Sequence, residues 1–198
     1  GRVLLDWIGR FSATNKGPRD LVTEADYASQ KEIRRIVGAA FPDLGFVGEE
    51  ADAGAGQPHS GHKGHSVTGI RWIVDPLDGT TNYVHGFPAW CVSIALATGD
   101  DIIAATVLDP LRDACFSARA GGGATLNGEP IRTPTVTSLA DAIAALSFPP
   151  HVTADSPAVA DFLAVVPHVH SVRRTGSTAL NLAWLACGRL HTFWARQI

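Results

Sequence analysis

The chain has 198 residues, of which 45% are hydrophobic and 18% charged, and its formal net charge is −3. This length and composition are typical of a globular protein with one large or two small domains. The charge balance excludes a strong electrostatic surface for nucleic acid or an anionic membrane, and no apolar run approaches the roughly 20 residues of a membrane span. We therefore expect neither nucleic acid nor membrane as a partner.

The three cysteines, Cys91, Cys115 and Cys187, are widely spaced and lie among apolar residues. An odd number in such surroundings indicates buried thiols rather than disulfides. The sequence also shows no signal peptide. Both observations favour a reducing compartment, so we expect a cytoplasmic protein.

The first part of the chain has helical periodicity. Apolar spacing indicates a helix over residues 3–11, and a turn cluster follows over 15–20. Thr23 and Asp26 resemble a capping box, with Asp in place of Glu, that begins a helix over 24–41. The apolar stripe expected on this second helix consists of Ile33, Ile36, Val37 and Ala40.

A short strand is expected over residues 44–47, and it ends in the acidic pair Glu49 and Glu50. The Gly-, Ser- and His-rich stretch over 53–68 then indicates a surface loop. A zinc site is an alternative reading of its regularly spaced histidines, but a Gly-rich loop without cysteine offers such a site little preorganisation. The histidines in question are His59, His62 and His65.

Residues 72–82, Trp-Ile-Val-Asp-Pro-Leu-Asp-Gly-Thr-Thr-Asn, form the most informative stretch. A buried strand is expected over 71–74, and Pro76 cannot continue a central strand, so the chain is expected to leave the sheet at Asp75. The carboxylates of Asp75 and Asp78 and the Leu77 carbonyl can then point at one spot. Such hard oxygen ligands suit Mg²⁺.

The glycine that follows these ligands suits an anion. Gly79 allows a close backbone approach, and the amides of Gly79, Thr80 and Thr81 would open a helical turn that favours phosphate. Two simpler readings stay open at this point. Asp-Gly is a common turn dipeptide, and an aspartate before Thr-Thr-Asn can cap a helix.

The middle of the chain reads as an antiparallel sheet. Apolar runs over 89–98 and 102–109 form a hairpin, a further strand covers 114–119, and the Asn127-Gly128 turn closes one more. A change in composition near Pro134 suggests a domain boundary. We therefore expect an N-terminal domain over 1–134 and a C-terminal domain over 135–198.

The second half has an α/β rhythm, and its last helix begins with another anion-friendly end at Ser177 and Thr178. The expected strands cover 142–148, 168–172 and 190–194, and the expected helices cover 156–166 and 173–187.

Three acidic residues, Glu49, Asp75 and Asp78, follow the ends of expected strands. Open α/β sheets bind ligands at such ends, and three carboxylates would repel one another unless a cation joined them. Together with Gly48-Glu49-Glu50 and residues 176–179 (Gly-Ser-Thr-Ala), the stretch over 72–82 resembles the inositol monophosphatase family of Mg²⁺-dependent, lithium-sensitive phosphatases.

The resemblance implies a fold between α+β and α/β, a layered αβαβα sandwich with an antiparallel N-terminal sheet and a smaller α/β part. It also implies metal ligands: Glu49, Asp75 and the Leu77 carbonyl for a first Mg²⁺, and Asp75 with Asp78 for a second. A small phosphorylated substrate and hydrolysis by a metal-activated water are implied with them. Homodimers are common in the family, although the sequence shows no interface.

Catalytic roles carried over by the resemblance fall on Thr80, Asp26 and Glu49, with the Thr80–Asp26 pair orienting the attacking water. The resemblance also places Lys16 near the site and Glu50 behind the metal ligands. The phosphate-binding residues it implies are Gly79, Thr80, Asp78, Ser177 and Thr178.

Two departures from the family pattern leave the substrate open. The family often has a sugar-binding glutamate where Ala195 stands, and the given sequence stops before the Trp-Asp motif that completes the second metal site. Inositol monophosphate or a related sugar or polyol phosphate is the first expectation. Histidinol phosphate, fructose 1,6-bisphosphate and nucleotide 3′-phosphates are alternatives, as is a non-catalytic role beside the transcription machinery.

Overall fold

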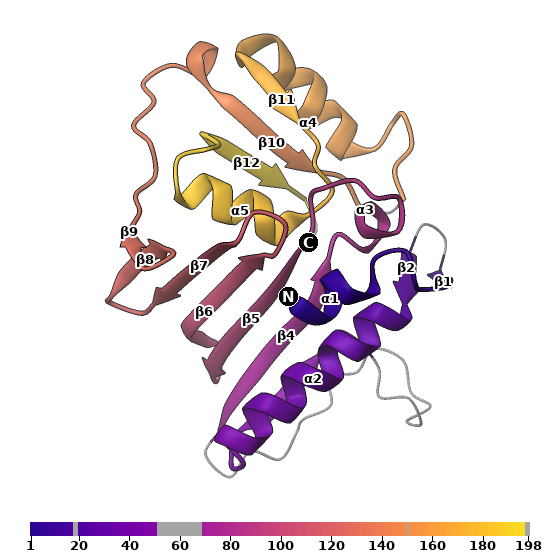
Figure 1. Cartoon of the computed structure of the whole chain (residues 1–198). Helices are drawn as coiled ribbons and strands as arrows, with labels where there is room; N and C mark the ends of the chain where they lie inside the picture. The colour runs from indigo at the N-terminus through magenta and orange to yellow at the C-terminus, as the bar shows by residue number, and fades with distance from the viewer. Residues whose placement is uncertain (18–19, 51–68, 150, 197–198) are drawn as a thin grey trace.

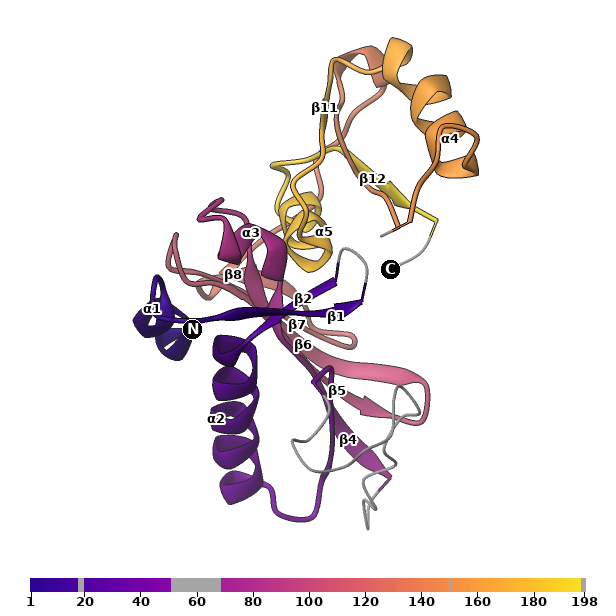
Figure 2. The ribbon, with the colours of Figure 1, turned by 90° about the vertical axis from the view of Figure 1, so that its right-hand side faces the viewer.

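The structure, a computed structural model, describes residues 1–17, 20–50, 69–149 and 151–196. Five layers are stacked in it (Figures 1 and 2). Helices α1 (Arg2–Trp7) and α2 (Glu24–Ala40) cover one face of a large sheet, and α5 (Thr178–Ala186) covers the other. A small sheet lies beyond α5, and α4 (Pro157–Val165) covers its outer side. This αβαβα arrangement confirms the expected fold class.

The large sheet has seven strands in the order β3-β4-β5-β6-β7-β8-β9. Every neighbouring pair from β4 onward is antiparallel, as predicted, whereas β3 pairs with β4 in parallel. A parallel pair requires a long connection, and the chain between β3 and β4 is long enough for one. The strands are β3 (Gly45–Gly48), β4 (Ile70–Asp78), β5 (Cys91–Thr98), β6 (Asp101–Asp109), β7 (Ala114–Arg119), β8 (Gly123–Leu126) and β9 (Glu129–Pro130).

The expected exit of the chain from the sheet at Asp75 is wrong, because β4 continues to Asp78. Its pairing with β5 is interrupted between Asp75, which lies opposite Ser93, and Asp78, which lies opposite Cys91. Pro76 sits inside this irregularity. A proline is tolerated there because a bulge does not require its missing N–H.

The small sheet is parallel, with the order β11-β10-β12, and consists of β10 (Ile143–Ser147), β11 (Ser171–Arg173) and β12 (Thr192–Ala195). Its elements follow the α/β rhythm predicted from the sequence. The division into domains 1–134 and 135–198 stays a prediction. Helix α5 belongs to the second part by sequence, yet Leu180 and Ala183 of this helix pack into a core with Phe116 of the large sheet.

Two hydrophobic clusters hold the layers together. The first lies between the N-terminal helices and the large sheet and is built around Leu4, Leu77 and Trp90. Tyr83 joins it, and its hydroxyl donates to the Leu4 carbonyl oxygen at 2.6 Å. Since Leu77 lies between Asp75 and Asp78, the core fixes the backbone of the acidic stretch directly.

Helix α2 confirms the expected helix but not its expected buried stripe. The capping box of Thr23 and Asp26 is present, whereas Ile36 is 52% exposed. The residues of α2 that are buried are Ala25, Asp26, Ser29 and Gln30. The helix therefore turns a largely polar face inward, and this face points toward the end of β4.

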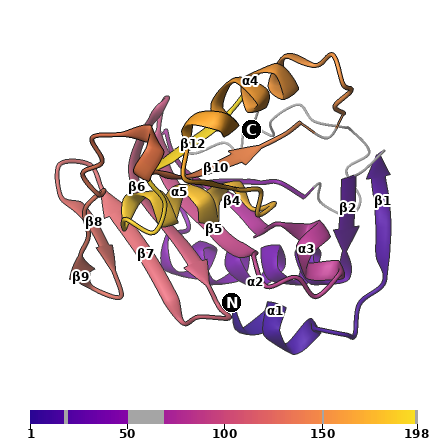
Figure 3. The ribbon, with the colours of Figure 1, turned by 90° about the horizontal axis from the view of Figure 1, so that it is seen from above.

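The antiparallel pair of β1 (Ala13–Gly17) and β2 (Asp20–Thr23) was missed by the sequence analysis, which expected a turn over 15–20; residues 18–19 of that turn lie outside the described residues. This pair lies beside α3 (Thr80–Val84) at one edge of the molecule (Figure 3). Helix α1 ends at Trp7, earlier than expected. The expected loop over 53–68, with His59, His62 and His65, lies outside the described residues, as does the Lys16 side chain.

Cys91, Cys115 and Cys187 are free thiols, but only Cys91 is buried as expected, whereas Cys115 and Cys187 are partly exposed. Within the ranges that the structure describes, none of the helices has both the length and the apolar character needed to cross a membrane.

Candidate metal centre

The parallel pairing of β3 with β4 brings two acidic residues of neighbouring strands together. Gly48 lies opposite Val74, and the next residue, Glu49, donates its backbone N–H to the Val74 carbonyl at 2.9 Å. Asp75 follows Val74 directly. The predicted ligands Glu49 and Asp75 therefore lie side by side, Glu49 directly after β3 and Asp75 within β4, although 26 positions separate them in the chain.

The electrostatics of Asp75 indicate an excess of negative charge. Burial, followed by the charges of Glu49 and Asp78 and a hydrogen bond with the Glu49 side chain, raises the pKa of the Asp75 carboxyl to about 9. The backbone N–H of Leu77, 3.0 Å from Asp75 Oδ1, acts in the opposite direction. A bound cation would relieve this repulsion and let Asp75 ionise.

Asp78 is turned toward the N-terminus of α5. Its Oδ2 accepts hydrogen bonds from Ser177 Oγ at 2.7 Å and from the Ala179 N–H at 2.6 Å, and the Thr178 N–H lies 3.3 Å from its Oδ1. A carboxylate at this position is stabilised by the free amides and the dipole of the helix. Asp78 therefore links the large sheet to α5, and it engages the amides that the sequence analysis assigned to phosphate.

The thiol of Cys91 completes the surroundings of Asp78, with its Sγ 3.8 Å from Oδ2. Burial, and then the charge of Asp78, raises the pKa of this thiol, so it stays protonated as a weak donor. In the described part of the chain, no three His, Cys, Asp or Glu side chains are already gathered around one point as metal ligands.

The donor chemistry nevertheless fits Mg²⁺. Glu49, Asp75 and Asp78 supply carboxylate oxygens, and Leu77, between the two aspartates, adds a carbonyl oxygen that accepts from Thr80 Oγ1 at 3.0 Å. Mg²⁺ prefers oxygen ligands and retains several waters, so it does not require a closed protein cage. The charge of Glu49 disfavours ionisation of the neighbouring Asp75, and a divalent cation bound between them would favour it.

Thr80 and Asp26 are in contact. Thr80 Oγ1 lies 3.1 Å from Asp26 Oδ1, across 54 positions of sequence. Asp26 is 1% exposed, and its other oxygen accepts from both the N–H and the hydroxyl of Thr23, at 2.9 and 2.6 Å. The capping box of α2 therefore holds the carboxylate that meets Thr80.

Gly79 joins β4 to α3 in a conformation that other residues rarely adopt, with φ of 96°. A Cβ at this position would lie 2.9 Å from the Ala89 carbonyl oxygen and 3.2 Å from the Cβ of Trp90. Both the backbone angle and the lack of space therefore require glycine. The tight turn is what places Thr80 directly after the acidic residues.

Two polar residues that hold the site were not singled out from the sequence. Gln30 donates from Nε2 to the Glu50 carbonyl at 2.8 Å and accepts from the Glu50 N–H at 3.0 Å. Ser29 donates to the Pro76 carbonyl at 3.1 Å. The spacing of Asp26, Ser29, Gln30 and Ile33 matches one helix face, and this periodicity would have revealed them.

Asn82 is a third residue of this kind. Its Nδ2 donates to the Ala89 carbonyl at 2.5 Å and to the Thr175 carbonyl at 2.7 Å. It therefore ties α3 to the turn before α5, where Ser177 and Thr178 begin. No pattern around Asn82 in the sequence indicates this long-range contact.

Comparisons with known proteins agree with the geometry. The sequence model of the Inositol monophosphatase family matches residues 7–197. The chain is 38% identical over 193 residues to an inositol-1-monophosphatase of Rhizobium meliloti, covering 96% of this chain and 69% of that protein. It is 35% identical over 202 residues to the Nus factor SuhB of Xylella fastidiosa, covering 100% of this chain and 70% of that one.

Among solved structures, the extragenic suppressor protein suhB of Bartonella henselae superposes with a TM-score of 0.90 at 34% identity. The alignment covers 100% of this chain and 74% of that one.

Proposed function

Because the chain belongs to the inositol monophosphatase family, we propose that it is a Mg²⁺-dependent phosphomonoesterase. Its substrate would be inositol monophosphate or a related small sugar or polyol phosphate. The observation that carries this proposal is the acidic cluster of Glu49, Asp75 and Asp78, in which burial, and then the charges of Glu49 and Asp78, raise the pKa of Asp75 to about 9. A buried carboxylate that ionises only beside a cation is typical of a metal site.

Glu49, Asp75 and the Leu77 carbonyl would hold one Mg²⁺, and Asp75 with Asp78 would hold a second. Bound Mg²⁺ would lower the pKa of a coordinated water and polarise the phosphate. Two residues of α2 hold the backbone of the ligands in place. Gln30 hydrogen-bonds the backbone of Glu50, next to Glu49, and Ser29 hydrogen-bonds the Pro76 carbonyl, between Asp75 and Leu77.

Thr80 and Asp26 would orient the attacking water. When Thr80 donates its proton to the buried Asp26, the hydroxyl oxygen is left as an acceptor for a hydrogen bond from water. Asp26 cannot turn away, because Thr23 donates twice to its other oxygen. A water fixed in this manner is positioned for attack on phosphorus.

The phosphate would lie between the turn at Gly79 and Thr80 and the α5 end at Ser177 and Thr178, with Asp78 between them. The two backbone segments converge on the Asp78 carboxylate, which accepts from Ser177 and Thr178, so phosphate would take over these donors only once Asp78 turns toward Mg²⁺. Anions are stabilised at such helix ends.

A phosphate-release screen tests the function. The protein is incubated with inositol 1-phosphate, histidinol phosphate, fructose 1,6-bisphosphate and a nucleotide 3′-phosphate, with Mg²⁺ or with EDTA. We expect Mg²⁺-dependent release that is largest for the inositol or a related polyol phosphate, and inhibition by Li⁺. Release that persists in EDTA, or no release from any substrate with Mg²⁺, would refute the proposal.

A second function is favoured by one observation, the 35% identity to a relative named Nus factor SuhB. A role beside the transcription machinery would not require the metal ligands. Co-purification with RNA polymerase that is unchanged in Asp75→Asn, together with an inactive phosphate screen, would support this role instead. The expected homodimer and cytoplasmic location stay proposals, and sedimentation velocity measures the former.

A further inference from the structure

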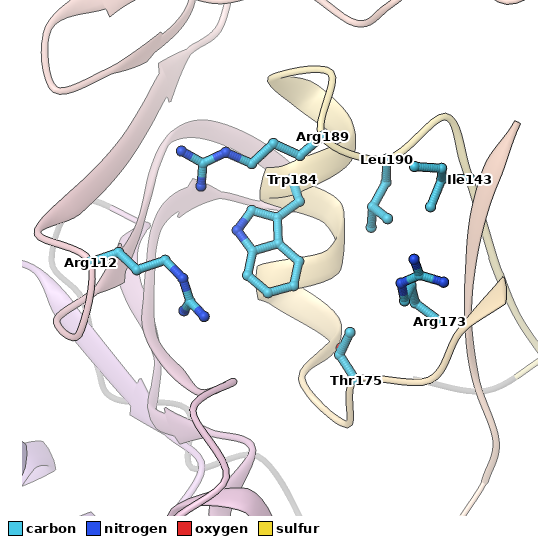
Figure 4. Close-up of a pocket in the computed structure, with 7 residues that line it drawn as sticks. All are labelled: Arg112, Ile143, Arg173, Thr175, Trp184, Arg189 and Leu190. Carbon is cyan, nitrogen blue, oxygen red and sulfur yellow. The ribbon is translucent and has the colours of Figure 1, made fainter. Parts of the chain in front are cut away.

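A cavity of about 490 Å³ lies beside α5, between the β6–β7 turn and the small sheet. Figure 4 shows Trp184 of α5 at its centre, with Arg112 and Arg189 on one side of the indole and Arg173 on the other. Ile143 and Leu190 supply an apolar wall next to Arg173. The cavity shares no residue with the metal centre, so it is a separate candidate site.

The cavity carries more positive charge than its surroundings neutralise. Arg112 pairs with the fully buried Asp109 at 2.7 Å and also donates to the Pro88 carbonyl at 3.0 Å. Arg173 hydrogen-bonds the neighbouring Val172 carbonyl at 3.1 Å, and the Arg189 guanidinium lies 5.9 Å from the centre of the Phe116 ring. Within the described residues, neither of these two arginines forms an ion pair with a carboxylate.

The Trp184 indole adds a hydrogen-bond donor to those of the arginines. The indole Nε1 of Trp184 is buried and has no hydrogen-bond acceptor among the residues that the structure describes. In Figure 4 this nitrogen is on the side of the ring that faces Arg112 and Arg189. A buried donor without an acceptor destabilises the unliganded state, and an oxyanion at this position would remove that cost.

We propose that this cavity binds a small organic phosphate that carries at least two negative charges. Guanidinium groups match phosphate oxygens in two-pronged hydrogen bonds, and the apolar wall suits the organic part of the ligand. The volume lies within the range of small-molecule sites. The net charge of −3 favours a small anion over nucleic acid.

Calorimetric titration with ATP in the presence of EDTA tests the proposal. Without metal, the carboxylates of the metal centre repel an anion, so binding under these conditions reports on the arginines and is independent of phosphatase activity. We expect one ATP per chain. Arg173→Gln and Arg189→Gln should each weaken binding about tenfold or more, as expected for a charged hydrogen bond, and the double variant about 100-fold.

The two arginines suit substitution because both are exposed and, in the described parts of the chain, have no carboxylate partner. Arg112 is left intact, since its removal would leave the buried Asp109 unpaired. Arg10→Gln, at an exposed arginine that does not line the cavity, is the charge-matched control and should change the affinity less than twofold.

Trp184→Phe keeps an aromatic ring but removes the indole N–H, and we expect it to weaken ATP binding about fivefold. Circular dichroism and thermal melting establish that each variant is folded. An absence of ATP binding, or equal binding by the double variant and the Arg10→Gln control, would overturn the proposal. A double variant that only shifts the size-exclusion volume would assign this face to contact between copies of the chain, and would overturn it as well.

Discussion

Asp75→Asn should stabilise the metal-free protein while it abolishes the response to Mg²⁺. In the folded chain the Asp75 carboxyl has a pKa of about 9, against a reference value of 3.8. The unfolded chain therefore releases a proton that the folded chain retains between these pH values. The raised pKa of Asp75 therefore stabilises the folded chain fully below pH 3.8, and this stabilisation is lost as the pH rises toward 9.

Asparagine imitates the protonated form of this aspartate. Its carbonyl oxygen can still accept from the Leu77 N–H, now 3.0 Å from Asp75 Oδ1, and its amide can donate to Glu49. The variant avoids the linked loss of stability, which reaches about 4 kcal/mol at pH 7. We therefore expect the free energy of unfolding of Asp75→Asn to exceed that of the wild type by up to this amount.

Urea unfolding in EDTA at pH 5, 7 and 9 measures this difference, which should grow with pH. When Mg²⁺ is added in excess, the wild type should gain stability by ligand linkage and the variant should not. A variant that is less stable than the wild type in EDTA at pH 9 would refute the picture of mutually repelling carboxylates.

Three further predictions concern residues around the site. Thr80→Ala should lower phosphate release about 100-fold, because it loses the group that orients water, whereas Thr80→Ser should retain most activity. Gln30→Leu should lower the free energy of unfolding in urea by about 2–4 kcal/mol, since it removes two buried hydrogen bonds to the Glu50 backbone. Weaker Mg²⁺ binding should accompany this loss. Unchanged stability would contradict the role of Gln30 in holding this backbone. Gly79→Ala should destabilise the protein by about 1–3 kcal/mol, and by more than Gly86→Ala does. Both glycines have positive φ, but only at Gly79 would a Cβ meet other atoms. Equal melting temperatures for the two variants would show that the contact is unimportant.

Many individual helices and strands were predicted because periodicity and turn chemistry act locally, whereas the order of the layers was implied by the family resemblance. The hairpin of β5 and β6 and the α2 capping box follow from residues close to one another in the chain. The prediction that β4 ends at Asp75 was wrong, because tertiary pairing with β5 accommodates Pro76 in a bulge. Local rules for proline contain no information about the partner strand.

The site was predicted in its acidic residues but not in its supporting contacts. Glu49 and Asp75 were found because carboxylates at strand ends are unusual, and family resemblance joined them. The engagement of Asp78 with the α5 end spans about 100 positions of sequence, so no local pattern indicates it. The polar buried face of α2 was missed because apolar residues were assumed to mark the inner side of the helix.

The most direct test of the account is a calorimetric Mg²⁺ titration of the wild type, Glu49→Gln and Asp75→Asn at pH 7 in two buffers of different ionisation enthalpy. The account predicts that the wild type binds Mg²⁺ with release of a proton, because Asp75 must ionise to become a ligand. Both variants should bind much more weakly, and Asp75→Asn should release no proton. Equal Mg²⁺ affinity in all three proteins would contradict the assignment of this acidic cluster as the metal centre.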